Sequence, residues 1–90
     1  MVISFNRVVS TVSALNSRFS MLSKTDLSDS LVKQLFREYV VKLKPIALSD
    51  SFAIVKTYRR DKYNRIVYMR VKLTLSRDIH NNPLVTVEYL

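Results

Sequence analysis

The residues with the clearest chemistry are cations and tyrosines that alternate within one stretch of the chain. Seven Lys and Arg residues between Lys56 and Lys72 face a single acid, Asp61. Cations neutralise phosphates with release of counterions, and tyrosine rings stack on unpaired bases. The mixture predicts binding of nucleic acid, with single-stranded or irregular RNA favoured over DNA. The predicted contacts are Lys56, Tyr58, Arg59, Arg60, Lys62, Tyr63, Arg65, Tyr68, Arg70 and Lys72.

The same residue types also occur on strands that bind nothing. Long cations keep an exposed strand soluble and discourage edge pairing, and tyrosine has a high preference for strands. The charge of the whole chain favours the binding interpretation, because 15 Lys and Arg against 7 Asp and Glu give a net charge of +8. An excess of this size, gathered in one segment, indicates a polyanionic partner.

The sequence offers little for catalysis, and we expect no catalytic residues, no metal site and no cofactor. The chain has no Cys and one histidine, His80, in a predicted turn with Asn81 and Asn82. Zinc sites need several such ligands together. The absence of glycine excludes the glycine-rich loops that cradle nucleotide phosphates. A ribonuclease that uses His80 with nearby Tyr and Arg residues is a minor alternative.

The spacing of apolar residues divides the chain into a helical part and a strand part. Intervals of three and four predict helices over residues 5–23 and 27–43, joined by a short turn into an antiparallel pair. From Ser51 the period changes to two and predicts strands over residues 52–59, 67–75 and 84–90. Asp, Asn and Pro residues in 60–64 and 78–83 predict the intervening turns.

These elements predict an α+β fold for a single small basic domain of residues 1–90. Two N-terminal antiparallel helices would pack on one face of a three-stranded antiparallel meander sheet, since only they can cover its apolar side. In the middle strand, the odd-numbered residues from Val67 to Leu75 would face the helices. Tyr68, Arg70 and Lys72 would then lie on the open face.

The last predicted strand suggests an alternative function. It is apolar on both faces, and such a strand needs cover on both sides, which a second copy could supply at the sheet edge. The predicted oligomerisation contacts are Leu84, Val85, Val87 and Tyr89. The sequence thus predicts a non-enzymatic structural module of a ribonucleoprotein or viral particle, or a homo-oligomeric scaffold, and both can hold together.

Other interpretations concern the helices. Residues 1–24 contain three cations, no acid and seven hydroxyl side chains, a composition typical of mitochondrial targeting segments. The first helix could also lie in a membrane interface, and Lys33 and Arg37 invite a comparison with helix-turn-helix proteins. No stretch is long and apolar enough to predict a membrane span, so we expect a soluble protein whose compartment the sequence does not indicate.

Overall fold

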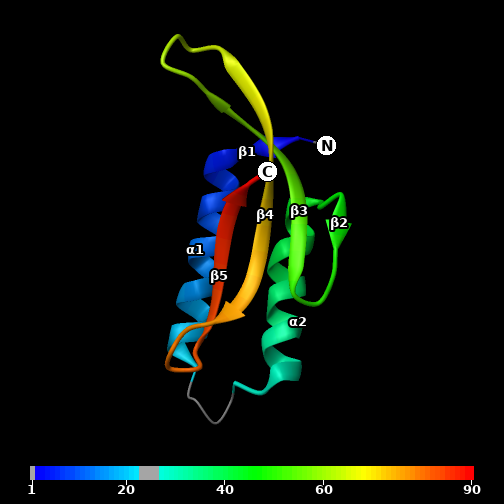
Figure 1. The fold of residues 1–90 in the computed structure, drawn as a ribbon, viewed down its shortest axis with the longest axis vertical. Coiled ribbons are helices and arrows are strands. Elements are labelled where there is room, and N and C mark those ends of the chain that lie inside the picture. The colour runs from blue at the N-terminus through cyan, green and yellow to red at the C-terminus, as the bar shows by residue number, and fades with distance from the viewer. Residues whose placement is uncertain (1, 23–26) are drawn as a thin grey trace.

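Two α-helices and a five-stranded sheet make up the part of the chain that the computed structural model describes, residues 2–22 and 27–90 (Figure 1). The predicted α+β class is confirmed. The elements are β1 (Ile3–Ser4), α1 (Phe5–Met21), α2 (Asp29–Val40), the 3-10 helix η2 (Val41–Leu43), β2 (Ala47–Leu48), β3 (Phe52–Arg60), β4 (Ile66–Arg77) and β5 (Pro83–Tyr89).

Serine caps fix the start of both α-helices. The Ser4 hydroxyl accepts the Arg7 N–H at 3.3 Å, and the Ser28 hydroxyl accepts the Leu31 N–H at 3.2 Å. Each bond satisfies one of the amides that a helix leaves without a partner in its first turn. The predicted start of the first helix is confirmed at Phe5, and its regular part ends at Met21.

The second helix is shorter than predicted. Its regular part spans Asp29–Val40, and the chain then tightens into η2, which ends at Leu43. Lys44 follows in the left-handed region, with φ 50°, immediately before Pro45. Proline disfavours helical geometry in the residue before it, so the chain leaves the helix at this point.

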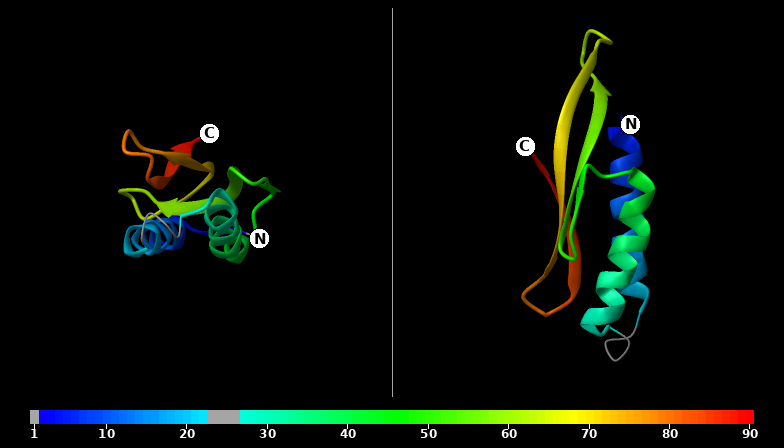
Figure 2. Two further views of the ribbon diagram at one scale, coloured as in Figure 1. Left: turned by 90° about the horizontal axis from the view of Figure 1, so that it is seen from below. Right: turned by 90° about the vertical axis from the view of Figure 1, so that its right-hand side faces the viewer.

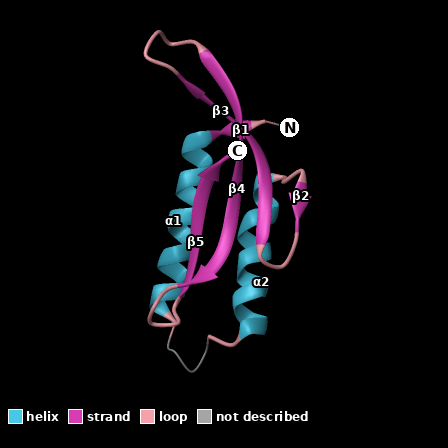
Figure 3. Ribbon diagram, in the orientation of Figure 1, coloured by secondary structure: helices cyan, strands magenta, loops and turns pink. Residues whose placement is uncertain are grey.

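The sheet differs from the predicted three-stranded antiparallel meander. The meander is present as β3, β4 and β5, but β1 and β2 both pair with the outer edge of β3, and β1 runs parallel to it. The prediction of three strands was therefore wrong, and the sheet is mixed (Figure 3). Each added strand is two residues long. Two residues are too few to give the alternation by which a sequence reveals a strand.

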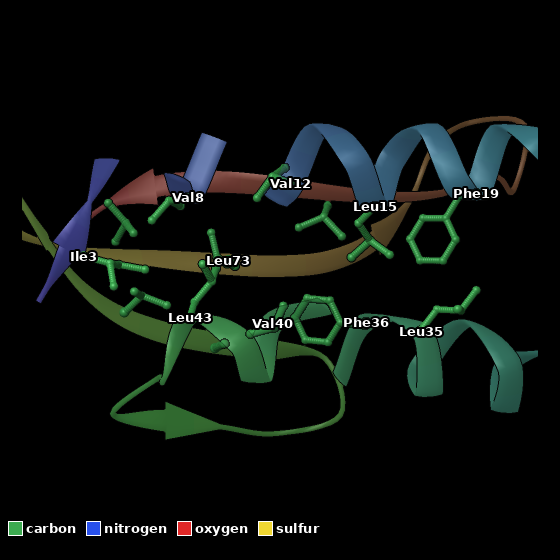
Figure 4. Close-up of a cluster of buried hydrophobic side chains, with 14 of the residues drawn as sticks. Ile3, Val8, Val12, Leu15, Phe19, Leu35, Phe36, Val40, Leu43 and Leu73 are labelled. Carbon is green, nitrogen blue, oxygen red and sulfur yellow. The ribbon is translucent and has the colours of Figure 1, made fainter. Parts of the chain in front are cut away.

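Both helices lie on one face of the sheet and run antiparallel to each other (Figures 1 and 2). The core fills the space between them and the sheet (Figure 4). Leu15 of α1, Phe36 of α2 and Leu73 of β4 meet there and are fully buried. The helices leave the opposite face of the sheet uncovered (Figure 2).

The hairpin of β3 and β4 extends past the helices and past the other strands (Figures 1 and 2). β1 pairs with β3 only as far as Tyr58, and the final residue, Leu90, donates its N–H to the Arg70 carbonyl at 3.0 Å. Residues 59–69, which we call the ribbon, therefore form a two-stranded projection to which no other strand of the described residues adds on either edge. The projection helps to give the molecule extents of 47 × 23 × 19 Å.

The turns after β3 and β4 have the same structure. In the first, the Asp61 carboxylate accepts the N–H groups of Tyr63 and Arg65, and Asn64 has φ 62°. In the second, the Asp78 carboxylate accepts the N–H groups of His80 and Asn82, and Asn81 has φ 63°. Asparagine tolerates this left-handed geometry and takes the place of the glycine that the chain lacks. The shared sequence pattern is Arg-Asp-x-x-Asn, at residues 60–64 and 77–81.

Candidate nucleic-acid interface

The faces of β4 follow the predicted alternation. Val71 and Leu73 are fully buried toward the helices, whereas Tyr68 is 69% exposed and Arg70 is exposed on the open face. Lys72 is half-buried on the same face. Val71, Leu73 and Leu75 of β4 thus contribute to the core, and the even-numbered side chains are free of it.

Strand pairing brings five of the predicted contacts side by side. Lys56 lies opposite Arg70, Tyr58 lies opposite Tyr68, and Arg60 lies opposite Ile66 one step nearer the tip. Successive rows are two residues apart along each strand, or about 7 Å. A row of two tyrosines therefore lies between two rows that carry cations. We call this surface the basic face; it consists of Lys56, Tyr58, Arg60, Tyr68 and Arg70.

Two further predicted contacts lie apart from the basic face. Arg59 pairs with Val67 on the helix side of the sheet, where it borders a hollow at the start of α1. Lys72 lies over the Phe52 ring, with Nζ 5.0 Å from the ring centroid, and stands opposite Glu88 of β5. Its charge thus has an aromatic partner and an adjacent acid, so Lys72 is a weaker candidate than Arg70.

The other predicted contacts form the tip of the ribbon. Lys62 Nζ and the Arg65 guanidinium lie 5.1 and 5.0 Å from the centroid of the Tyr63 ring. Arg65 also donates from Nε to the Asp61 carboxylate at 3.3 Å. The Tyr63 ring therefore contacts two cations at the tip through cation–π interactions, which leaves less of the ring available for stacking than the sequence suggested.

Asp61 is held by the turn and does not oppose the basic face. Its carboxylate accepts the Tyr63 N–H at 2.8 Å and the Arg65 N–H at 2.9 Å. The bond from the Arg65 backbone is the main reason why the pKa of this carboxyl lies below its ordinary value of 3.8. Its negative charge is thus matched by donors within the turn.

A hollow of about 340 Å³ lies beside Tyr68. Sequence reasoning predicted three of its wall residues and missed three others. Val2 reaches the hollow because β1 pairs with β3, and no local pattern could have indicated that pairing. The lining residues are Val2, Lys56, Thr57, Tyr68, Met69 and Arg70.

The predicted oligomerisation residues divide between three environments. Leu84 is 39% exposed on the open face, whereas Val85 is buried and Val87 packs against the core. Tyr89 stacks on Phe5 of α1, with ring centroids 5.7 Å apart. β5 is the last strand of the sheet, and no other strand among residues 2–22 and 27–90 pairs with its outer edge.

His80 lies in the turn of residues 78–82, at the end of the molecule opposite the ribbon tip (Figure 1). The fold therefore does not bring it near the tyrosines of the basic face. Residues 2–22 and 27–90 contain no cluster of three or more potential metal ligands from His, Cys, Asp and Glu. Within the same residues, neither helix has the length and apolar character needed to cross a bilayer.

The chain matches no protein-family model, no curated protein and no solved structure. Its function is therefore inferred from the chemistry of its own residues.

Proposed function

We propose that this protein is a non-enzymatic nucleic-acid-binding module that uses the basic face, with RNA favoured over DNA. It would serve as a structural part of a ribonucleoprotein or viral particle. The pairing of Lys56 with Arg70 beside the Tyr58–Tyr68 pair supports this proposal most directly. The helices leave this surface open, so a polymer can reach it without a change in the fold (Figure 2).

The charges at the ribbon would act on phosphate groups. Arg60 donates from Nη1 to the Asn64 carbonyl at 3.1 Å, so this cation is ordered before binding. Ordered cations lose less side-chain entropy when they meet a phosphate. Each neutralised phosphate releases counterions, which makes binding dependent on salt.

Binding to a fluorescein-labelled oligouridylate, measured by anisotropy over a range of salt concentrations, tests the proposal. We expect the affinity to fall with salt at a log–log slope of roughly −0.7 per phosphate contact. The double variant Lys56→Glu/Arg70→Glu should flatten that slope and weaken binding. Arg18→Glu/Lys33→Glu is the matched control, because it changes the net charge equally on the helices. An absence of binding at low salt, or binding independent of salt, would refute the proposal.

A second candidate function is assembly through the edge of β5. Because the Leu90 N–H bonds to β4, the antiparallel alternation directs the backbone groups of Val87 and Tyr89 away from β4. An incoming strand from a second copy would pair with these groups. Sedimentation velocity should show a dimer for the wild type and a monomer for Val87→Pro, which removes one outward donor. A wild type that remains monomeric at high concentration would exclude this candidate.

A further inference from the structure

Tyr68 differs from the other aromatic residues near the basic face. Tyr63 carries two cations over its ring, Phe52 carries Lys72, and Tyr58 is half-buried. Tyr68 is 69% exposed, and within residues 2–22 and 27–90 no cation lies over its ring. Its ring is therefore the one on this surface that is free to stack on a ligand.

The hollow beside Tyr68 combines apolar and cationic walls. Val2 provides apolar contact, and Lys56 and Arg70 add positive charge. Neither Lys56 nor Arg70 forms an ion pair within the described part of the chain. A flat ring with an attached phosphate would bind to both kinds of wall, because the ring can stack on Tyr68 while the phosphate contacts the cations.

A further cation lies on the other side of the tyrosine row. Arg60 is about 7 Å from that row toward the tip, and Lys56 and Arg70 are the same distance from it toward the body. A base stacked on Tyr68 has one phosphate on its 5′ side and another on its 3′ side. The arrangement therefore provides a cation for each of the two phosphates that flank a single nucleotide.

From this geometry we infer that the hollow beside Tyr68 is a binding site for one unpaired nucleotide of a polynucleotide chain. A base within a duplex has both faces covered by its neighbours, so it cannot stack on a side chain unless it leaves the helix. The site therefore selects single-stranded segments or extruded bases over regular duplex. This inference rests on the proposed function and specifies the form of nucleic acid that the basic face recognises.

Two substitutions of equally exposed tyrosines test the inference. Tyr68→Leu removes the free ring and leaves every charge in place. Tyr89→Leu is the matched control, because Tyr89 is 65% exposed and stacks on Phe5 of α1, away from the basic face. We expect Tyr68→Leu to weaken binding of labelled oligouridylate roughly 5- to 150-fold with an unchanged salt slope. Tyr68→Phe keeps the ring and should retain wild-type affinity, which separates lost stacking from a disturbed fold.

A blunt-ended RNA duplex of two annealed strands, which has no loop and no unpaired base, is the second probe. The wild type should bind it more weakly than the single strand, and Tyr68→Leu should not weaken its binding further. If Tyr68→Leu binds the single strand as well as the wild type does, or if the duplex and the single strand bind alike, the nucleotide site is refuted. Salt-dependent binding would in that case still support the proposed function. No binding of either probe at low salt would refute both.

Discussion

The side-chain amide of Asn16 hydrogen-bonds to both backbone groups of Val85. Its Nδ2 donates to the Val85 carbonyl at 3.0 Å, and its Oδ1 accepts the Val85 N–H at 2.9 Å. A neighbouring strand would use these same two groups. The Asn16 side chain of α1 therefore takes the place of a neighbouring strand at Val85. A further strand could pair only with the part of β5 beyond Val85.

Removal of this amide should destabilise the protein. We expect Asn16→Ala to lower the free energy of unfolding by about 1–3 kcal/mol, because two backbone groups on a partly buried edge lose their partner. Urea denaturation measures the change. Ser13→Ala, an exposed site on the same helix, should stay within about 0.5 kcal/mol of the wild type. Equal stabilities of the two variants would show that the Asn16 amide contributes nothing.

The second prediction concerns Asn81, which supplies the left-handed position of the turn between β4 and β5. At φ 63° the Cβ of alanine clashes with the backbone, whereas glycine has no Cβ and no such clash. We therefore expect Asn81→Ala to lower the melting temperature, with a loss of about 1 kcal/mol, and Asn81→Gly to stay near the wild type. Thermal denaturation of both variants checks this order. An alanine variant as stable as the glycine variant would mean that the backbone relaxes away from positive φ.

The sequence was most informative where a pattern repeats within one element. The faces of β4 were predicted correctly from Val71 to Leu75, because the alternation in the sequence covers nine residues and a shift of one would bury Arg70 and Lys72. The prediction that Val67 and Met69 also face the helices was wrong, because the hairpin extends past the helices at these residues (Figures 1 and 2). The strand β1 was missed because two residues carry no period, and the partner of Ile3 is Thr57. Such a pairing depends on tertiary packing alone.

The same limit applied to the candidate site. The sequence identified Lys56, Tyr68 and Arg70 by residue type, and β3–β4 pairing determines that they are neighbours. Val2 could not be predicted, since it reaches the hollow only through β1. The equivalence of the two turns could have been found from the sequence, because residues 60–64 and 77–81 share the pattern Arg-Asp-x-x-Asn.

The third prediction concerns acid stability. Backbone hydrogen bonds, chiefly from Arg65 to Asp61 and from Asn82 to Asp78, hold the pKa of both carboxyls below the ordinary value of 3.8. A carboxyl whose pKa is lower in the folded state stabilises the protein above its unfolded pKa, and this contribution is lost as the pH falls through the folded pKa. The free energy of unfolding should therefore decrease as the pH is lowered through 3.8 and below.

Urea denaturation at a series of pH values measures this loss. In Asp61→Asn/Asp78→Asn the decrease below pH 3.8 should be shallower, because these two groups no longer titrate. A double variant with the same pH dependence as the wild type would show that other carboxyls account for the acid sensitivity.

The final prediction connects the core with the nucleotide site through Thr57. This threonine is fully buried, and its hydroxyl donates to the Ile3 carbonyl at 2.7 Å. Valine has nearly the same shape but no donor, so Thr57→Val should lower the free energy of unfolding by about 1–3 kcal/mol. Because the bond holds β1 against β3, its loss should also loosen Val2 at the wall of the hollow.

Two measurements separate these effects. Urea denaturation measures the free energy of unfolding. Anisotropy with labelled oligouridylate, at a temperature where all variants are folded, measures whether the affinity depends on Val2 at the wall of the hollow. Thr57→Ser keeps the hydroxyl and should retain the affinity of the wild type, although it loses a buried methyl group. If Thr57→Val binds oligouridylate as tightly as Thr57→Ser does, then β1 contributes to the fold and not to the site.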